Sequence, residues 1–177
     1  MKGIIIGFGN IGQVHYERYS DLNVDIQAVI ETDKAKINLL HSKGLDTYKD
    51  LSKFKPINEI DFIDICSPTY LHYEHIIKAM RYNKAIFVEK PVVRTKREVN
   101  YLRNFSYQHP IFVGEVEQYN PSLTSFLNYQ GKPKLIEMSR IVNLDFFLKG
   151  NKPWFLDKRL SGGIVLDLMI HDINLLV

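Results

Sequence analysis

The sequence predicts an α/β protein in which a doubly wound parallel sheet is followed by an incomplete α+β second domain. Short apolar runs alternate with longer segments of helical period, which is the pattern of βαβ units. A glycine-rich turn directly follows the first apolar run. After Gly114 the alternation stops and only one further clear strand follows. We therefore expect a first domain at residues 1–116 and the start of a second at 117–177.

Each apolar run and each periodic segment gives one expected element. Strands are expected at about 2–7, 24–31, 61–66, 84–89 and 111–116, with helices between them at about 11–20, 33–43, 70–83 and 95–106. Thr69 precedes the third helix and is a candidate N-cap. In the second domain we expect a helical segment at 121–130, a strand at 134–142 and a buried apolar helix that follows Gly163 and runs to Val177.

Composition and charge exclude several classes of protein. The chain of 177 residues is 45% hydrophobic and 24% charged, as ordinary globular proteins are. Its net charge of +3 is spread without blocks of like charge, so we expect neither a nucleic-acid nor a membrane partner. The single cysteine, Cys66, cannot form an internal disulfide, which fits a reducing cytoplasmic location.

The stretch "IIIGFGNIG" (4–12) has the spacing G-x-G-x-x-G between a strand and a helix. Gly7 permits the tight turn, Gly9 lets the backbone approach a pyrophosphate, and Gly12 lets the helix pack close to the strand. Free N–H groups at the start of the helix would face the phosphates. This context predicts a Rossmann-type dinucleotide site that includes Gly7, Phe8, Gly9, Asn10, Ile11 and Gly12.

Glu31 ends the second strand, where a carboxylate can accept hydrogen bonds from both ribose hydroxyls of a dinucleotide. A 2′-phosphate would meet like charge there, so NAD is favoured over NADP. For Lys34 and Lys36 we favour a surface role over a grip on a 2′-phosphate. The alternative interpretation is a glycine turn with a surface glutamate.

Two later stretches carry side chains suited to catalysis. "SGGIVLDLMIHDIN" (161–174) places Asp167, His171 and Asn174 on one helical stripe. They are either a structural pair on a buried helix or a site in which His171 exchanges a proton near neutral pH. "VEKPV" (88–92) ends a strand with Lys90, which either faces a ligand crevice or marks a surface turn. The remaining histidines show no converging ligand set, and no metal site is expected.

Four motifs occur in a fixed order: "GFGNIGQVH" (7–15), "SPTYLH" (67–72), "EKP" (89–91) and "DLMIHD" (167–172). Together they resemble the Gfo/Idh/MocA oxidoreductase family over essentially the whole chain. That resemblance implies an NAD(P)-dependent enzyme that transfers hydride between a nicotinamide and a secondary alcohol of a sugar, sugar nucleotide or polyol. "VGEVEQYNP" (113–121) resembles members similar to UDP-N-acetylglucosamine 3-dehydrogenase, although Gln118 stands where those members usually carry arginine.

The resemblance also implies roles for single residues. Lys90 matches the lysine that hydrogen-bonds the reacting hydroxyl, Asp167 the acid that orients the substrate, and His171 the usual proton acceptor. Glu89 would support the nicotinamide end, and a cis peptide often precedes the residue at Pro91. The implied cofactor contacts outside the glycine loop and Glu31 are Ser67, Pro68, Thr69, His72, Glu89 and Lys90.

Family members usually continue well beyond this length, with a sheet that covers the substrate and forms oligomer contacts. We therefore expect either a truncated product or fragment, or a chain that another polypeptide completes. With its second domain completed, it would form a homo-oligomer. The alternative to an enzyme is a truncated, non-catalytic dinucleotide-binding protein. A different Rossmann reductase is disfavoured because the Glu-Lys-Pro turn and the Asp-x-x-x-His helix occur together.

Overall fold

The computed structural model describes residues 1–141, 143, 154 and 156–176. The chain divides into two compact units, Met1–Val113 and Gly114–Val177. This division lies close to the domain boundary expected at residue 116.

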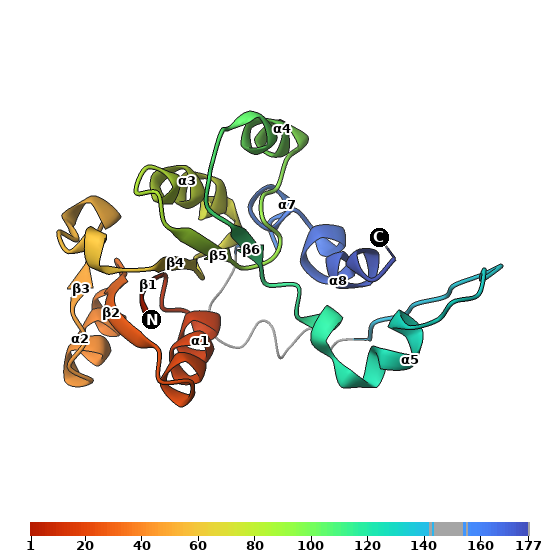
Figure 1. The fold of residues 1–177 in the computed structure, drawn as a ribbon, viewed down its shortest axis with the longest axis horizontal. Helices are drawn as coiled ribbons and strands as arrows, with labels where there is room; N and C mark the ends of the chain where they lie inside the picture. The colour runs from red at the N-terminus through yellow and green to blue at the C-terminus, as the bar shows by residue number, and fades with distance from the viewer. Residues whose placement is uncertain (142, 144–153, 155, 177) are drawn as a thin grey trace. The chain divides into compact units, whose positions relative to one another are not determined.

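The first unit contains a six-stranded parallel sheet in the order β3-β2-β1-β4-β5-β6 (Figure 1). Its strands are β1 (Lys2–Ile6), β2 (Asp25–Ile30), β3 (Thr47–Tyr48), β4 (Phe62–Ile65), β5 (Ala85–Val88) and β6 (Ile111–Val113). The helices between them are α1 (Asn10–Asp21), α2 (Lys34–Ser42), α3 (Thr69–Met80) and α4 (Lys96–Asn104), with short 3-10 turns at Leu51–Lys53 and Ile57–Glu59. This arrangement confirms the predicted doubly wound sheet, whose strand order reverses between β1 and β4.

Two details differ from the expected elements. The strand β3 was not predicted, because two residues that pair with Val29 and Ile30 are too few to show an alternating pattern. Thr69 is not the N-cap of α3: Pro68 takes that position, and Thr69 is the first helical residue.

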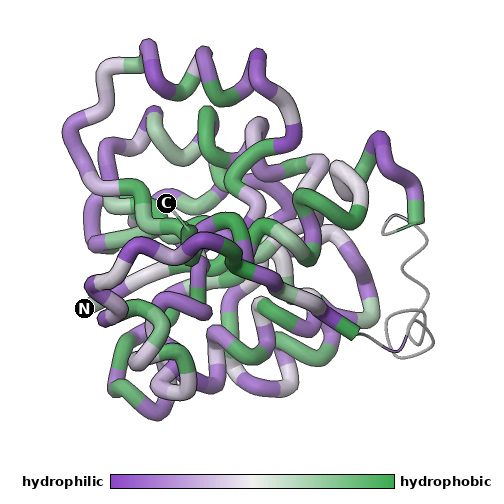
Figure 2. Tube along the Cα trace, turned by 90° about the vertical axis from the view of Figure 1, so that its right-hand side faces the viewer, coloured by the Kyte–Doolittle hydropathy of each residue, from purple (hydrophilic) through white to green (hydrophobic). Residues whose placement is uncertain are grey.

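Apolar side chains on both faces of the sheet form the core. Along β4, Ile63 and Ile65 face the cluster that includes Ile76 of α3, whereas Phe62 and Cys66 face the cluster under α1 and α2. Strands that are buried on both faces consist of continuous apolar runs, and for this reason they could be predicted from the sequence. Hydrophobic and hydrophilic residues alternate along the helical turns (Figure 2), as expected for helices that cover a core with one side.

The second unit consists of short helical pieces in its described residues. These are the 3-10 turns η3 (Val116–Tyr119) and η4 (Pro121–Leu123), the helices α5 (Thr124–Leu127), α7 (Lys158–Ser161) and α8 (Ile170–Asn174), and the π turn η6 (Val165–Met169). The helix expected at 121–130 is thus a 3-10 turn and a single α turn.

The strand predicted at 134–142 is wrong for residues 134–141, which form no strand; Val142 lies outside the described residues. Leu135 and Ile141 are 82% and 97% exposed. An apolar pattern becomes a strand only when a neighbouring strand accepts its hydrogen bonds, and the described residues of this unit supply none.

The apolar helix after Gly163 was expected to be buried, and this expectation is wrong for its described residues. Ile164, Val165 and Met169 are 66%, 49% and 46% exposed. The π turn also interrupts the 3.6-residue period on which the stripe of polar side chains was based. Within the described part of the chain, no helix is both long and apolar enough to cross a membrane.

Candidate active site

The glycine loop joins β1 to α1, and two of its glycines are required by the chain's own packing. Gly7 has a φ of +91°, and a Cβ there would lie 2.8 Å from the Cα of Ser67 in the loop after β4. A Cβ on Gly12 would lie 2.2 Å from the carbonyl oxygen of Gly7. Side chains at these positions would collide with backbone, so the loops after β1 and β4 can touch only with glycine there.

Gly9 differs from both. Its φ of −76° and ψ of −166° suit any residue, and an added Cβ would meet no atom within 4 Å. No feature of the described chain therefore requires glycine at this position, whereas a ligand that approaches the backbone would. Gly9 also caps α1 without a side-chain hydrogen bond, so the first-turn N–H groups of Asn10, Ile11 and Gly12 have no intrahelical acceptor. These donors and the open face at Gly9 fit a pyrophosphate.

Phe8 is held by contacts within the chain. Its ring is 1% exposed and packs edge-on against Tyr16 in the core. Its backbone N–H donates to Glu31 Oε2 at 2.9 Å. Phe8 thus holds the loop to the sheet, and its contact with a cofactor stays a prediction.

Glu31 is 8% exposed and ties the glycine loop to the end of β2. Its Oε1 accepts from the N–H groups of Thr32 (2.7 Å) and Asp33 (3.0 Å). Burial alone would raise the pKa of Glu31, but the backbone N–H donors and Lys36 hold it below its usual value. The Nζ of Lys36 lies 3.4 Å from Oε2, so this lysine pairs with Glu31 instead of having only a surface role. Glu31 is thus a charged carboxylate at the crevice.

The loop after β4 carries Ser67, Pro68 and Thr69 beside Gly7, at the carboxyl edge of the sheet. His72 of α3 is 1% exposed, and its ring nitrogens lie 2.8 Å from the Pro91 carbonyl oxygen and 2.7 Å from that of Ser67. Burial lowers the pKa of His72, although the two carbonyls oppose this shift. Both nitrogens face backbone carbonyl oxygens, and the contact of His72 with a cofactor stays a prediction.

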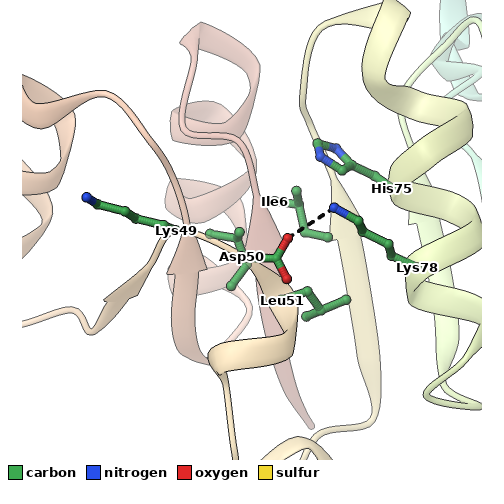
Figure 3. Close-up of a pocket in the computed structure, with 7 residues that line it drawn as sticks. Ile6, Lys49, Asp50, Leu51, His75 and Lys78 are labelled. Atoms are coloured by element: carbon green, nitrogen blue, oxygen red, sulfur yellow. Dashed lines mark hydrogen bonds and ion pairs between the residues drawn. The ribbon is translucent and has the colours of Figure 1, made fainter.

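A small pocket lies where β1 and β2 end and β3 continues into a turn (Figure 3). It is lined by Ile6, Ile30, Lys49, Asp50, Leu51, His75 and Lys78. The Nζ of Lys78 lies 3.0 Å from Asp50 Oδ2. Burial lowers the pKa of His75 to about 4, so its ring is neutral, and its Nδ1 lies 2.8 Å from Ser67 Oγ. Sequence reasoning missed Lys49 and Asp50 because they follow the unrecognised β3. The turn that Asp50 caps was the available signal.

The turn Glu89-Lys90-Pro91 follows β5 at the same edge. The Glu89 N–H donates to the carbonyl oxygen of Ile65 at 3.0 Å, which continues the ladder between β5 and β4. The peptide bond between Lys90 and Pro91 is cis, as the resemblance implied. Lys90 is half-buried. The structure thus brings Lys90 to the edge that also carries the glycine loop and Ser67.

Asp167 and His171 belong to the second unit, so the predicted catalytic set is divided between the two units. Asp167 lies in the π turn, and its N–H donates to the carbonyl oxygen of Gly163 at 3.0 Å. His171 Nδ1 lies 3.5 Å from Glu115 Oε2. The Nδ2 of Asn174, on the same helix as His171, is buried without a hydrogen-bond partner among the described residues.

Comparison with known proteins agrees with this geometry. Residues 1–108 match a family described as "Oxidoreductase family, NAD-binding Rossmann fold", GFO_IDH_MocA. The chain is 26% identical to myo-inositol 2-dehydrogenase of Thermotoga maritima over 97% of this chain and 52% of that protein. It is 21% identical to UDP-N-acetylglucosamine 3-dehydrogenase of Acidithiobacillus ferrooxidans over 99% of this chain and 53% of the relative. The chain therefore spans about half the length of these curated relatives.

Solved structures share the fold. The WlbA dehydrogenase of Thermus thermophilus in complex with NAD and UDP-GlcNAcA has a TM-score of 0.78 at 21% identity, over 99% of this chain and 62% of the other. The UDP-N-acetylglucosamine 3-dehydrogenase of A. ferrooxidans has a TM-score of 0.77 at 20% identity, over 99% and 55%. The family match covers most of the chain and confirms NAD as the cofactor type. The chain belongs to the Gfo/Idh/MocA oxidoreductase family, whose first domain is an NAD-binding Rossmann fold.

Proposed function

We propose that this chain binds NAD and takes part in hydride transfer between the nicotinamide and a secondary alcohol of a sugar, sugar nucleotide or polyol. Gly9 carries the proposal, because the structure leaves open the face at which a pyrophosphate would meet the backbone. The relatives named as inositol and UDP-N-acetylglucosamine dehydrogenases support the class of substrate.

The residues that would hold the cofactor are the first-turn N–H donors of α1, Gly9 and the loop of Ser67, Pro68 and Thr69. Glu31 supports NAD over NADP, since its pKa is held low and a charged carboxylate would repel a 2′-phosphate. Four donors already occupy its acceptor positions: the backbone N–H groups of Phe8, Thr32 and Asp33 and the Nζ of Lys36. We expect a ribose hydroxyl to replace the longest of these contacts, that of Lys36 at 3.4 Å.

When NAD is bound, its nicotinamide accepts the hydride. In the proposed site Lys90 hydrogen-bonds the reacting hydroxyl, Asp167 orients the substrate and His171 takes the hydroxyl proton. The Glu115 carboxylate at 3.5 Å favours the imidazolium that His171 becomes. The buried Nδ2 of Asn174 could donate a hydrogen bond to a substrate hydroxyl.

A second function, dinucleotide binding without turnover, has one observation in its favour. The second unit exposes large apolar side chains on the helical segment that carries Asp167, including Ile164 and Met169. A site whose walls are open to water would bind the cofactor through the first unit and lack a desolvated space for the alcohol.

The two functions are separated by NAD reduction, followed as NADH absorbance with inositols, sugars and UDP-sugars. We expect turnover that Lys90→Ala and His171→Ala each reduce at least about 100-fold, the usual range for a general acid–base group. His41→Gln, which changes an exposed histidine on α2, is the control and should keep wild-type turnover. Unchanged turnover in both site variants would refute the assigned roles. NADH binding without turnover of any substrate would support the second function, and absence of NADH binding would refute both.

A further inference from the structure

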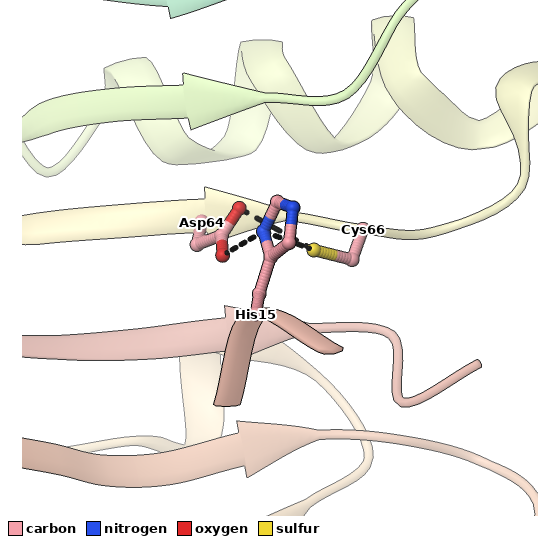
Figure 4. A group of neighbouring side chains, drawn as sticks. All are labelled: His15, Asp64 and Cys66. Carbon is pink, nitrogen blue, oxygen red and sulfur yellow. Dashed lines mark hydrogen bonds and ion pairs between the residues drawn. The ribbon is translucent and has the colours of Figure 1, made fainter. Parts of the chain in front are cut away.

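A group of titratable side chains lies inside the first unit. His15 of α1 reaches between two residues of the β4 region, Asp64 and Cys66 (Figure 4). Its Nδ1 lies 2.8 Å from Asp64 Oδ2, and the Asp64 side chain is fully buried. The hydroxyl of Tyr19 donates to the same oxygen at 3.0 Å, and the Cys66 thiol lies 3.4 Å from Asp64 Oδ1. A carboxylate at the centre of a buried strand requires such partners.

The other ring nitrogen of His15 reaches the turn that carries Lys90. Its Nε2 lies 3.3 Å from Glu89 Oε1. Only a doubly protonated ring can donate from both nitrogens. Burial alone would lower the pKa of His15, but the hydrogen bonds and charges of Asp64 and Glu89 outweigh it and raise the pKa to about 10. Among the described residues the titratable groups that face this ring are Tyr19 of α1, Asp64 of β4, Cys66 directly after β4, and Glu89 after β5.

A second histidine holds the same turn from the opposite face of the sheet. The Nδ1 of His72, on α3, lies 2.8 Å from the Pro91 carbonyl oxygen. The residue before Lys90 is therefore bonded to a histidine of α1, and the residue after it to a histidine of α3. The two helices cover different faces, as their separate core clusters show.

We propose that His15 and His72 are positioning residues that hold Glu89 and Pro91 from the two faces of the sheet and thereby fix the backbone that presents Lys90. The value of this arrangement for hydride transfer rests on the proposed function. The arrangement itself does not, since every contact lies within the first unit.

A metal ion is the competing interpretation of part of this group. Donor atoms of His15, Asp64 and Cys66 lie within 4.8 Å of one another. The hydrogen bonds already satisfy them, however: Asp64 receives Tyr19 and His15, and burial raises the pKa of the Cys66 thiol so that it stays protonated. A metal bound by these three residues would also not explain the contact of His15 Nε2 with Glu89, whereas positioning does. We therefore favour positioning and include zinc in the test.

The test compares His15→Gln and His72→Gln with the control His41→Gln in the whole 177-residue chain. Amide hydrogen exchange is measured for a peptide covering 87–93 and, as an internal reference, for β2 at 25–30. We expect exchange at 87–93 to accelerate about tenfold in the two test variants, the effect of one lost anchoring hydrogen bond, while the reference changes less. The control should match the wild type in both peptides.

Two further measurements separate positioning from a general loss of stability. In the wild type at pH 8, imidazole nitrogen NMR should show His15 protonated on both nitrogens. The double variant His15→Gln/Glu89→Gln should recover part of the protection at 87–93, because two amides can form a neutral hydrogen bond.

Four outcomes would overturn the proposal. In the two test variants these are equal acceleration of exchange in both peptides, or exchange at 87–93 as slow as in the wild type. In the wild type they are a neutral His15 ring at pH 8, or binding of one equivalent of Zn²⁺ that shifts the His15 signals. If a variant does not fold, the nitrogen NMR of the wild type still decides. If the wild type fails to bind NADH, the proposed function is refuted, while exchange in the free protein still tests the positioning of the turn.

Discussion

The two units treat their apolar side chains in opposite ways. Every buried hydrophobic residue among the described residues lies in the first unit, between Ile4 and Val93. The described residues of the second unit expose large apolar side chains instead, such as Ile141 at 97% and Leu156 at 62%. The first unit thus has an interior of its own. Cofactor binding can therefore be tested on the first unit's residues alone, whereas turnover also depends on the second.

The charged side chains of the two units also differ in burial. In the first unit Asp64 is fully buried beside His15 and Tyr19 of α1 and the Cys66 thiol. In the second, Arg140 lies 3.3 Å from Glu117 and 2.8 Å from Asp172 with all three side chains partly exposed. Removing one partner of a buried ion pair costs the protein much stability, whereas removing one partner of an exposed pair costs little. The following variants test this difference, from the largest expected effect to the smallest.

Asp64→Ala should have the largest effect. It leaves the charged His15 ring inside the sheet without its principal partner, and removing one member of a buried ion pair costs about 3–5 kcal/mol. Urea unfolding followed by circular dichroism measures this loss. Asp25→Ala, which removes an exposed carboxylate at the start of β2, should remain within about 0.5 kcal/mol of the wild type. Equal losses in the two variants would remove the distinction between buried and exposed charges.

Gly12→Ala should cause the second largest loss of stability. Its Cβ would lie 2.2 Å from the Gly7 carbonyl oxygen, so the loop or the helix must move, at a cost of about 1–3 kcal/mol. The same denaturation experiment measures it. Wild-type stability would show that the close approach of α1 to β1 is not required.

The pH dependence of stability should reveal His15. Its pKa is raised from 6.5 to about 10 by Asp64 and Glu89, against the effect of burial. A raised pKa in the folded state stabilises the protein fully below about 6.5, and the contribution is lost as the pH rises toward about 10. The melting temperature of the wild type should therefore fall more steeply from pH 6 to 10 than that of His15→Gln. Parallel curves would contradict a charged His15.

Arg140→Ala should have the smallest effect. Its pairs with Glu117 and Asp172 are partly exposed, and such pairs contribute about 0–1 kcal/mol. The difference should shrink further in 0.5 M salt, which screens exposed charges. A loss as large as that of Asp64→Ala would show that the second unit buries its charges too.

The sequence predicted the structural elements that depend on a local pattern of residues. Buried parallel strands read as continuous apolar runs, so five of the six strands and the glycine loop were found, while the two residues of β3 were too short to show a pattern. It could not predict contacts between segments distant in sequence, such as His15 with Glu89 or the Phe8 N–H with Glu31. The expected strand is absent at residues 134–141 because pairing depends on a neighbour that no local pattern reveals.

The most direct test of the account is an NADH titration, by calorimetry, of the wild type and Gly9→Ala. The added methyl group meets no atom of the chain within 4 Å and the backbone angles allow it, so the variant should be as stable as the wild type or slightly more so. If the open face at Gly9 receives a pyrophosphate, the dissociation constant for NADH should rise at least about tenfold, which corresponds to about 1.4 kcal/mol. Equal NADH affinity in a stable Gly9→Ala variant, or no binding by the wild type, would contradict the account.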